Sequence, residues 1–358
     1  IYIGVFIPEN VRMSLGEGKN EVRKLQSTGG STFTVSLPKP WILAQGLAAR
    51  DSLRVDWRPS GALRITPLDA KEHVLHKAYF ATKNLPENSL HDHLMGAYIS
   101  GSDEIHIEHR TGEAKEVSVQ VRRFLRSTRG FEIMDESENS VQLKCLMNAG
   151  DMPLHASLNR MYLQVTSLTR DIISVFEGES RSYITDAEER ENEADALLYL
   201  IDRQVRILLD SHAVATQLNL TRTQAVEYAN LARSLERMMD HSFSIANLVI
   251  EHPQITKNMI SMTPLEQLPI WQGSLKELMI NIRTRDSTRI EAARSDLKEA
   301  QRRLLKHEQN VLEHHRSNEW MAFDLRLSES VRRLCAYARD FGEILLNMKV
   351  FSELRRID

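Results

Sequence analysis

The stretch of sequence that decides the fold is Arg233-Ser-Leu-Glu236-Arg237-Met-Met-Asp240-His241-Ser-Phe-Ser-Ile245-Ala246. Apolar and small residues recur in it every three or four positions, which predicts an α-helix with one face turned to a core. Two acids, Glu236 and Asp240, interrupt that face one turn apart, so both side chains reach the same side of the helix. The predicted helix begins at the capping-box sequence Thr221-Arg-Thr-Gln224 and ends near Glu251.

A second predicted helix repeats this acidic interruption. Glu191-Asn-Glu-Ala-Asp195-Ala-Leu-Leu-Tyr199 also places two carboxylates four residues apart on a partly apolar face. A buried carboxylate is costly unless it is paired or binds a cation. If the two helices face each other, four acids suit iron, manganese, zinc or magnesium. The alternative is a solvated groove, because acids four apart are common on exposed helices.

From Met152 onward the chain is predicted to be all-helical. Two sets of three helices of similar length suggest an internal repeat, at about residues 151–253 and 264–354, and hence an all-α six-helix fold of two three-helix bundles. The predicted helices are Pro153–Glu177, Arg181–Ser211, Thr221–Glu251, Leu265–Thr284, Asp286–His314 and Met321–Glu353.

Two smaller domains are predicted ahead of the helices, so we expect a multi-domain α+β protein. After an N-terminal extension, 1–20, residues 21–69 are rich in β-formers and turns, with one short helix from Pro38 to Leu47. About fifty residues make a poor core alone, which favours a dimer. Residues 70–150 alternate strand and helix and end in a hairpin, which predicts a small α/β domain of the ferredoxin-like or regulatory-domain kind. Its histidines are expected to lie on the surface.

Composition and motifs limit the function. The chain has 358 residues, a net charge of −3 and two cysteines far apart, which excludes a disulfide scaffold or a cysteine zinc site. With no apolar run long enough to span a membrane, we expect a cytoplasmic protein without membrane insertion. The sequence has no phosphate-cradling loop or nucleophile elbow, and no Glu-x-x-His lies on the acidic face. We therefore expect a regulator and not an enzyme.

Three segments carry a family resemblance. The stretch from Arg233 to Ala246 resembles the third-helix signature of PhoU proteins, and the stretch from Glu191 to Tyr199 resembles their second-helix motif. The segment from Arg23 to Lys39, Arg23-Lys24-Leu-Gln-Ser-Thr-Gly29-Gly30-Ser-Thr-Phe-Thr-Val-Ser-Leu37-Pro38-Lys39, is similar to AbrB-type domains found ahead of PhoU halves in archaeal phosphate-uptake regulators.

The resemblance has several implications. It implies a swapped-hairpin β-barrel head that forms a homodimer and binds DNA, and metal bound at Glu191, Asp195, Glu236 and Asp240. It also implies that the protein restrains phosphate uptake through a transporter ATPase or a signalling partner. Residues 13–69 carry a surplus of three positive charges, which supports phosphate-backbone contacts. The expected DNA contacts are Arg23, Lys24, Lys39 and Arg50.

The second helical repeat departs from this pattern. Aligned on its acids, it places Asp296 and Ala300 opposite Glu191 and Asp195, and it places Arg339 and Glu343 opposite Glu236 and Asp240. This alignment predicts a degenerate second metal site in which Arg339 pairs with Asp296 or Glu343 and takes the place of a cation. Alternatively, Arg339 faces solvent and the register is off by a turn.

The predicted function is a phosphate-linked regulator of transcription or uptake that binds DNA through its head and metal through its bundle. The alternative is an adaptor that uses the head only to dimerise and restrains a phosphate transporter or sensor kinase by protein contact. Salt-dependent affinity for DNA separates the two.

Overall fold

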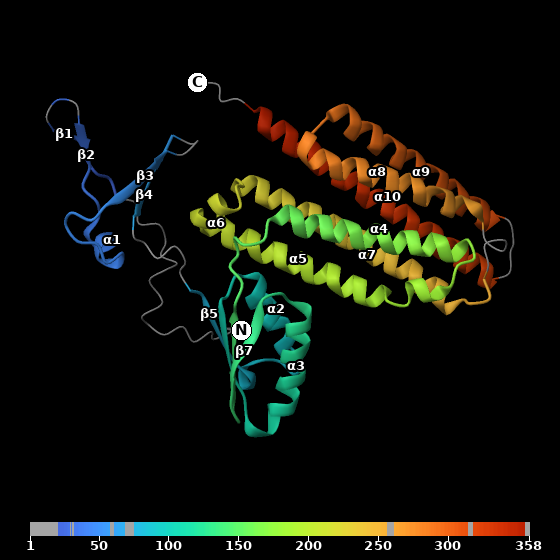
Figure 1. Ribbon diagram of the computed structural model, residues 1–358, viewed down its shortest axis with the longest axis horizontal. Helices are drawn as coiled ribbons and strands as arrows, with labels where there is room; N and C mark the ends of the chain where they lie inside the picture. Colours follow the sequence, from blue (N-terminus) through green and yellow to red (C-terminus); the bar gives the residue numbers. More distant parts are fainter. Residues whose placement is uncertain are drawn as a thin grey trace. The chain divides into compact units, whose positions relative to one another are not determined.

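The computed structural model of the chain describes residues 21–28, 30, 32–57, 61–68, 75–255, 261–313 and 318–354. The chain divides into two compact units, Ile1–Leu75 and His76–Asp358 (Figure 1). The predicted N-terminal extension, 1–20, lies outside the described residues. Among the helices described, none is long and apolar enough to cross a membrane.

The described residues of the first unit form two small antiparallel sheets and one short helix. Strands β1 (Gln26–Thr28) and β2 (Thr32–Thr34) pair with each other, as do β3 (Leu53–Trp57) and β4 (Leu63–Pro67). Helix α1 (Lys39–Ala44) has Pro38 at its N-cap and Pro40 in its first turn, where the missing N–H of proline costs no hydrogen bond. The described strands of this unit form two separate two-stranded sheets, so the swapped-hairpin barrel, which requires a second chain, stays a prediction.

Apolar side chains of the first unit lie open to solvent. Val22 is 98% exposed, Trp57 86% and Phe33 65%, and none of the unit's described residues is buried. Exposed apolar surface of this kind marks an interaction site. The dimer expected from the sequence would cover this surface, and it stays a prediction.

The second unit begins with a four-stranded sheet whose topology differs from the ferredoxin-like prediction. Its elements are β5 (Lys77–Ala81), the 3₁₀ turn η2 (Thr82–Asn84), α2 (Leu90–Ile99), β6 (Glu104–Glu108), the 3₁₀ turn η3 (Thr111–Glu113), α3 (Ala114–Ser127), β7 (Phe131–Glu136) and β8 (Ser140–Cys145). The strand order is β5-β6-β8-β7, with β5 parallel to β6.

The ferredoxin-like topology is therefore wrong. The chain runs βαβαββ, whereas the ferredoxin-like fold runs βαββαβ. Both helices precede the final two strands, and β7 and β8 close the sheet as a hairpin. The core contains side chains of the sheet and of α2 and α3, including Tyr98, Ile105 and Phe124, all buried.

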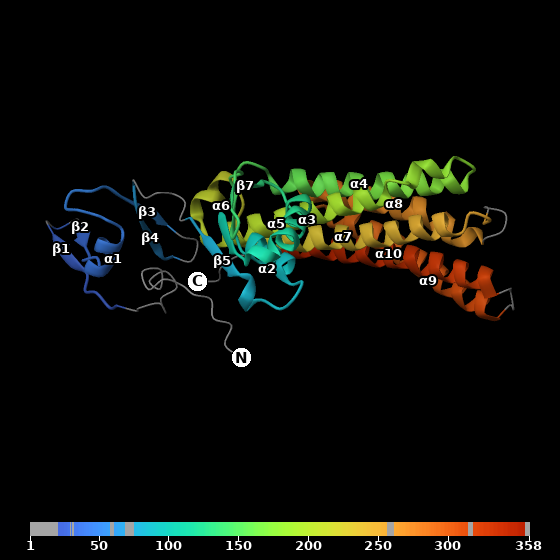
Figure 2. The same cartoon turned by 90° about the horizontal axis from the view of Figure 1, so that it is seen from below.

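Long helices form the rest of the second unit, and their ribbons run side by side in Figures 1 and 2. They are α4 (Leu154–Phe176), α5 (Ala187–Asp210), α7 (Arg222–Glu251), α8 (Met262–Thr284), α9 (Ser287–Glu313) and α10 (Asn318–Glu353). The 3₁₀ turn η4 (Arg181–Ile184) precedes α5, and a short helix that the sequence did not predict, α6 (His212–Gln217), follows it. The predicted capping box of α7 is confirmed, because Thr221 and Gln224 each bond the other's backbone N–H.

Packing and burial reveal the internal repeat. Helices α4 and α5 pack on α7, α8 and α9 pack on α10, and α7 packs on α10. Buried positions of α5 and α9 coincide at a spacing of 103 residues, as for Leu197 and Ala300. The same spacing relates α7 to α10, as for Met238 and Phe341. The repeat is therefore a property of the core, and it fixes which residues of the two halves correspond.

We predict that a variant lacking residues 1–75 keeps its helices but loses the dimer. The helical core lies wholly in the second unit, whereas the first unit, which is expected to form the dimer, has exposed apolar side chains and no buried residue among those described. Circular dichroism should show the helix content calculated for residues 76–358, and light scattering should give a monomer mass. A truncated chain that still scattered as the native dimer would place the interface in the helical unit.

Candidate metal centre

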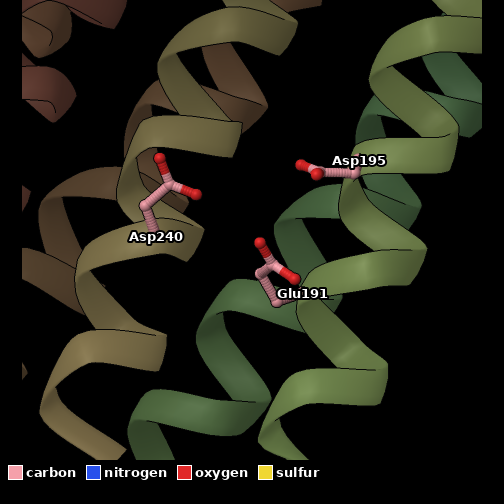
Figure 3. A group of neighbouring side chains, drawn as sticks. All are labelled: Glu191, Asp195 and Asp240. Carbon is pink, nitrogen blue, oxygen red and sulfur yellow. The ribbon is translucent and has the colours of Figure 1, made fainter. Parts of the chain in front are cut away.

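Three carboxylates meet between α5 and α7. Glu191 and Asp195 project from α5 toward Asp240 of α7 (Figure 3), and a ligand oxygen of each lies within 4.8 Å of the others. All three were predicted from the sequence. Among the described residues this is the one cluster of at least three acidic, histidine or cysteine side chains with metal-binding spacing. Carboxylate oxygens suit hard or intermediate cations, so the donor set fits the predicted metal.

The packing of α5 on α7 positions these acids. The two helices bury Ala194, Leu198, Leu235 and Met239 among other apolar residues of the core, and the acids lie along the edge of that contact. Glu191 and Asp195 are one turn apart, so both reach the same side of α5. The local sequence of α5 thus places Glu191 and Asp195 on one side of the helix, and the apolar contact beside them brings α7 close to both.

The fourth predicted ligand, Glu236, stands one turn before Asp240 on α7 but outside the cluster of three. It nevertheless shares their electrostatic environment. Burial raises the pKa of Glu236 to about 7, and the charges of Asp240 and Asp195 contribute to that rise. We therefore treat the acidic seam as the set Glu191, Asp195, Glu236 and Asp240, with Glu236 as its outlying member.

The other acids of the seam are also hard to ionise. Burial raises the pKa of Glu191 to about 7, with additional repulsion from Asp195 and Asp240. Burial and the charge of Asp240 raise the pKa of Asp195 to about 6. Burial likewise raises the pKa of Asp240, whereas Arg237 opposes that rise. A bound cation would relieve the repulsion between these partly buried carboxylates.

The remaining charged residues of the signature have other partners. Arg233 donates a hydrogen bond to Asp202 of α5 at 3.1 Å and joins the two helices near the seam. Arg237 lies over the ring of Tyr337 on α10, at 5.5 Å, and His241 stacks on the same ring at 5.7 Å. Because His241 faces α10, it stands apart from the carboxylates, as its position one residue after Asp240 indicates.

Sequence reasoning missed Tyr199, which is half-buried one turn after Asp195 on α5. Burial raises its pKa, and all four acids of the seam contribute, Asp195 most. Its ring also packs against the core of the four-stranded sheet. The spacing of four residues from Asp195 was the signal that could have identified it.

The second repeat holds basic residues where the first holds acids. At the spacing of 103 residues, Arg294, Lys298, Arg339 and Glu343 correspond to Glu191, Asp195, Glu236 and Asp240 respectively. The predicted register for α9 was therefore two residues off. Asp296 is exposed, whereas Ala300 is buried and corresponds to Leu197 of the first repeat. The error arose from aligning the acids of α9, although the buried positions determine the register.

In the second repeat, the arginine that lies beside Glu343 is Arg294 and not the predicted Arg339. It donates to Glu291 at 2.7 Å, and a second nitrogen lies 3.7 Å from Glu343. Arg339 instead donates to Gln301 at 2.7 Å, so the predicted pairing of Arg339 with Asp296 or Glu343 is wrong. Gly342 makes room for Arg294, since a Cβ there would lie 2.7 Å from its Cγ. The positive charge beside Glu343 is therefore a side chain of the protein itself, that of Arg294.

The predicted DNA contacts Arg23, Lys24, Lys39 and Arg50 are all exposed on the first unit. Arg23 forms an ion pair with Glu21. Arg50 has a left-handed backbone, φ 84°. Their role in DNA binding stays a prediction.

The fold and the seam define a helical-repeat domain with a carboxylate cluster in its first half. Comparison with protein families agrees, because residues 158–249 match the PhoU domain. The matched segment covers all of α5, most of α4 and α7, and all four acids of the seam. The comparisons with curated proteins and with solved structures gave no match.

The metal-free protein should lose stability as pH rises. The pKa values of Glu191, Asp195 and Glu236 lie near 7, 6 and 7 in the folded state, above the value of about 4 for an unfolded chain. The folded state therefore binds more protons across this window, and the free energy of unfolding falls as pH rises through about 7. In the variant Glu236→Gln/Asp240→Asn that fall should be smaller.

Urea unfolding in the presence of a chelator at pH 5 and at pH 8 measures the effect. An exposed pair of acids on α5, changed as Glu189→Gln/Asp210→Asn, is the matched control and should keep the native pH dependence. If the seam variant and the native protein lost stability equally, the acids would not be the source.

Metal should bind in the first repeat only. Restoring the acidic pattern in the second repeat with Arg294→Glu, Lys298→Asp and Arg339→Glu, beside the native Glu343, should roughly double the metal held per chain. Elemental analysis after loading with Mn²⁺ measures this. The neutral triple variant Arg294→Gln, Lys298→Asn and Arg339→Gln should show no gain. Native-level metal in Glu236→Gln/Asp240→Asn would show that the ion lies outside the first seam.

Proposed function

We propose that this chain is a phosphate-linked regulator that binds metal in its acidic seam and DNA through its first unit. The observation that carries the proposal is the meeting of Glu191, Asp195 and Asp240 inside the segment that matches the PhoU domain. The PhoU domain supports a role in phosphate homeostasis.

The metal would be held by carboxylates of α5 and α7. Glu191, Asp195 and Asp240 would supply the first ligands, and Glu236 is one turn from joining them. Such a set accepts iron, manganese, zinc or magnesium. A bound cation would offset much of the negative charge of the seam and hold α5 against α7, so its chemical task here is to fix helix geometry. We infer regulation and not catalysis, since His241 faces Tyr337 and the described seam lacks the Glu-x-x-His pairs of di-iron carboxylate enzymes.

DNA binding by the first unit rests on charge and on the need for a dimer. Arg23, Lys24, Lys39 and Arg50 are exposed, and the apolar surface of the same unit fits a second copy of this chain. A dimer doubles the surplus of positive charge on one object, which is suited to the phosphate backbone. Metal or partner binding in the bundle would then regulate attachment to DNA.

The second candidate function is an adaptor that restrains a phosphate transporter ATPase or a sensor kinase by protein contact. One observation favours it, the ion pair of Arg23 with Glu21, which engages one of the basic residues expected to contact DNA. In this case the first unit would serve only to dimerise the protein.

Salt-dependent DNA binding separates the two functions. The native protein should bind duplex DNA with an affinity that falls steeply with salt, and Arg23→Ala/Lys24→Ala should reduce the salt slope by about two units, one for each lost phosphate contact. Fluorescence anisotropy over a range of salt concentrations gives the slope. Arg302→Ala/Arg303→Ala, an exposed pair on α9, is the control with equal loss of charge. Absence of DNA affinity at low salt would favour the adaptor function over DNA binding.

A further inference from the structure

A ridge on α5 leads from the acidic seam to the four-stranded sheet. Asp195, Tyr199, Arg203 and Ile207 follow one another at intervals of four residues, which places them in one slowly turning row on the helix. Helix α5 packs against α2 and α3 of the α/β domain, and these helices lie beside it in both views (Figures 1 and 2). Eight residues of helix, about 12 Å, separate Asp195 from Arg203.

Arg203 fastens this ridge to the α/β domain. Its side chain is buried, with a residue exposure of 3%. One guanidinium nitrogen donates to the carbonyl oxygens of Tyr98 at 2.9 Å and Ser102 at 2.7 Å, and the other donates to Asp103 at 3.4 Å. The guanidinium also lies over the rings of Tyr98 and Phe131. A planar fork with three partners holds one geometry far better than a single ion pair would.

The partner loop is shaped to receive α5. Gly101 has φ +92°, a conformation that favours glycine, and a Cβ there would lie 2.9 Å from Cγ1 of Ile207. The loop between α2 and β6 therefore approaches the helix more closely than a side chain would permit. Contacts at Arg203 and Ile207 together fix residues 100–103 to two successive turns of α5.

The same loop holds the first residue of the second unit. The backbone N–H of His76 donates to the carboxylate of Asp103 at 2.9 Å, and the carbonyl of His76 accepts from the N–H of Asp103 at 2.7 Å and of Glu104 at 3.2 Å. His76 directly follows Leu75, where the first unit ends. Arg203 and His76 thus share Asp103, so a displacement of α5 acts on the point where the chain leaves the first unit.

Tyr199 lies between the seam and this loop. It is a partly buried residue of α5 that packs against the core of the α/β domain, and it stands one turn from Asp195 and one turn from Arg203. Tyr199 therefore continues the row of packed side chains on α5 from the acids to the loop.

We propose that α5 couples the cation of the acidic seam to the loop that holds His76, through Tyr199 and Arg203. The proposal rests on the proposed metal binding. Without a cation the acids of α5 and α7 repel, and with one they are drawn together, which favours one position of α5. Since Arg203 and Ile207 are fixed to the loop, that position also favours one arrangement of residues 100–103 and His76. Coupling of this kind is reciprocal, so weakening the Arg203 contacts weakens the metal site.

Two measurements on the full-length protein test the coupling. Calorimetric titration with Mn²⁺ alone should give an affinity at least about fivefold weaker in Arg203→Lys than in the native protein, at unchanged stoichiometry. The substitution keeps the charge but loses the fork. Arg303→Lys, an exposed arginine of α9, is the matched control and should bind Mn²⁺ as the native protein does. Asp103→Asn, which keeps an acceptor for His76, should weaken Mn²⁺ binding in the same direction.

Hydrogen exchange tests the coupling in the native protein itself. Saturating Mn²⁺ should slow exchange of the Asp103 and Glu104 amides in the native protein, and Arg203→Lys should abolish this slowing. Mn²⁺ that binds the native chain but leaves these amides unchanged would overturn the coupling alone. Native affinity in Arg203→Lys would also overturn it. Failure of the native chain to bind Mn²⁺ at all would overturn the metal-binding function on which it depends.

Discussion

The mutual repulsion of half-buried carboxylates between α5 and α7 is the constraint on which the rest of the structure depends. Glu191, Asp195 and Asp240 lie at the edge of an apolar contact that the bundle cannot give up, because the same helices carry its core. The packing of the two helices therefore holds the acids close together, and desolvation raises the pKa of each. Such a site is stable as an ionised cluster only with a counter-charge. The proposed cation would supply it and at the same time select the spacing of α5 and α7.

The second repeat supplies the counter-charge from its own side chains. Its helices correspond to those of the first in their buried positions, yet Arg294 stands where Glu191 stands and lies near Glu343. Gly342 gives the stem of that arginine the space it needs. In our proposal only the first half of the bundle needs an ion. That half contains α5, which packs against the α/β domain, so a single pair of helices would carry a metal signal.

Local patterns predicted the acidic cluster because its ligands are one turn apart on single helices, and helical period alone aligns Glu191 with Asp195. The face of α7 that the structure buries contains Leu235 and Met239. The pairing of strands that lie far apart in the sequence was harder to predict. The order of β6, β8 and β7 depends on which strand closes the sheet, and no local pattern encodes it. The predicted alignment of α9 with α5, and with it the place of Arg294, was wrong for a related reason. It matched the acids of the two helices, whereas the buried positions determine the register. Tyr199 and Arg203 acquire their roles only from the domain packed against them.

Anomalous diffraction from crystals of the full-length protein soaked in Mn²⁺ tests the central claim most directly. The account predicts a peak between α5 and α7 within coordination distance of Glu191, Asp195 and Asp240, and none beside Arg294 and Glu343. A strong peak elsewhere on the chain with none at these three carboxylates would contradict it.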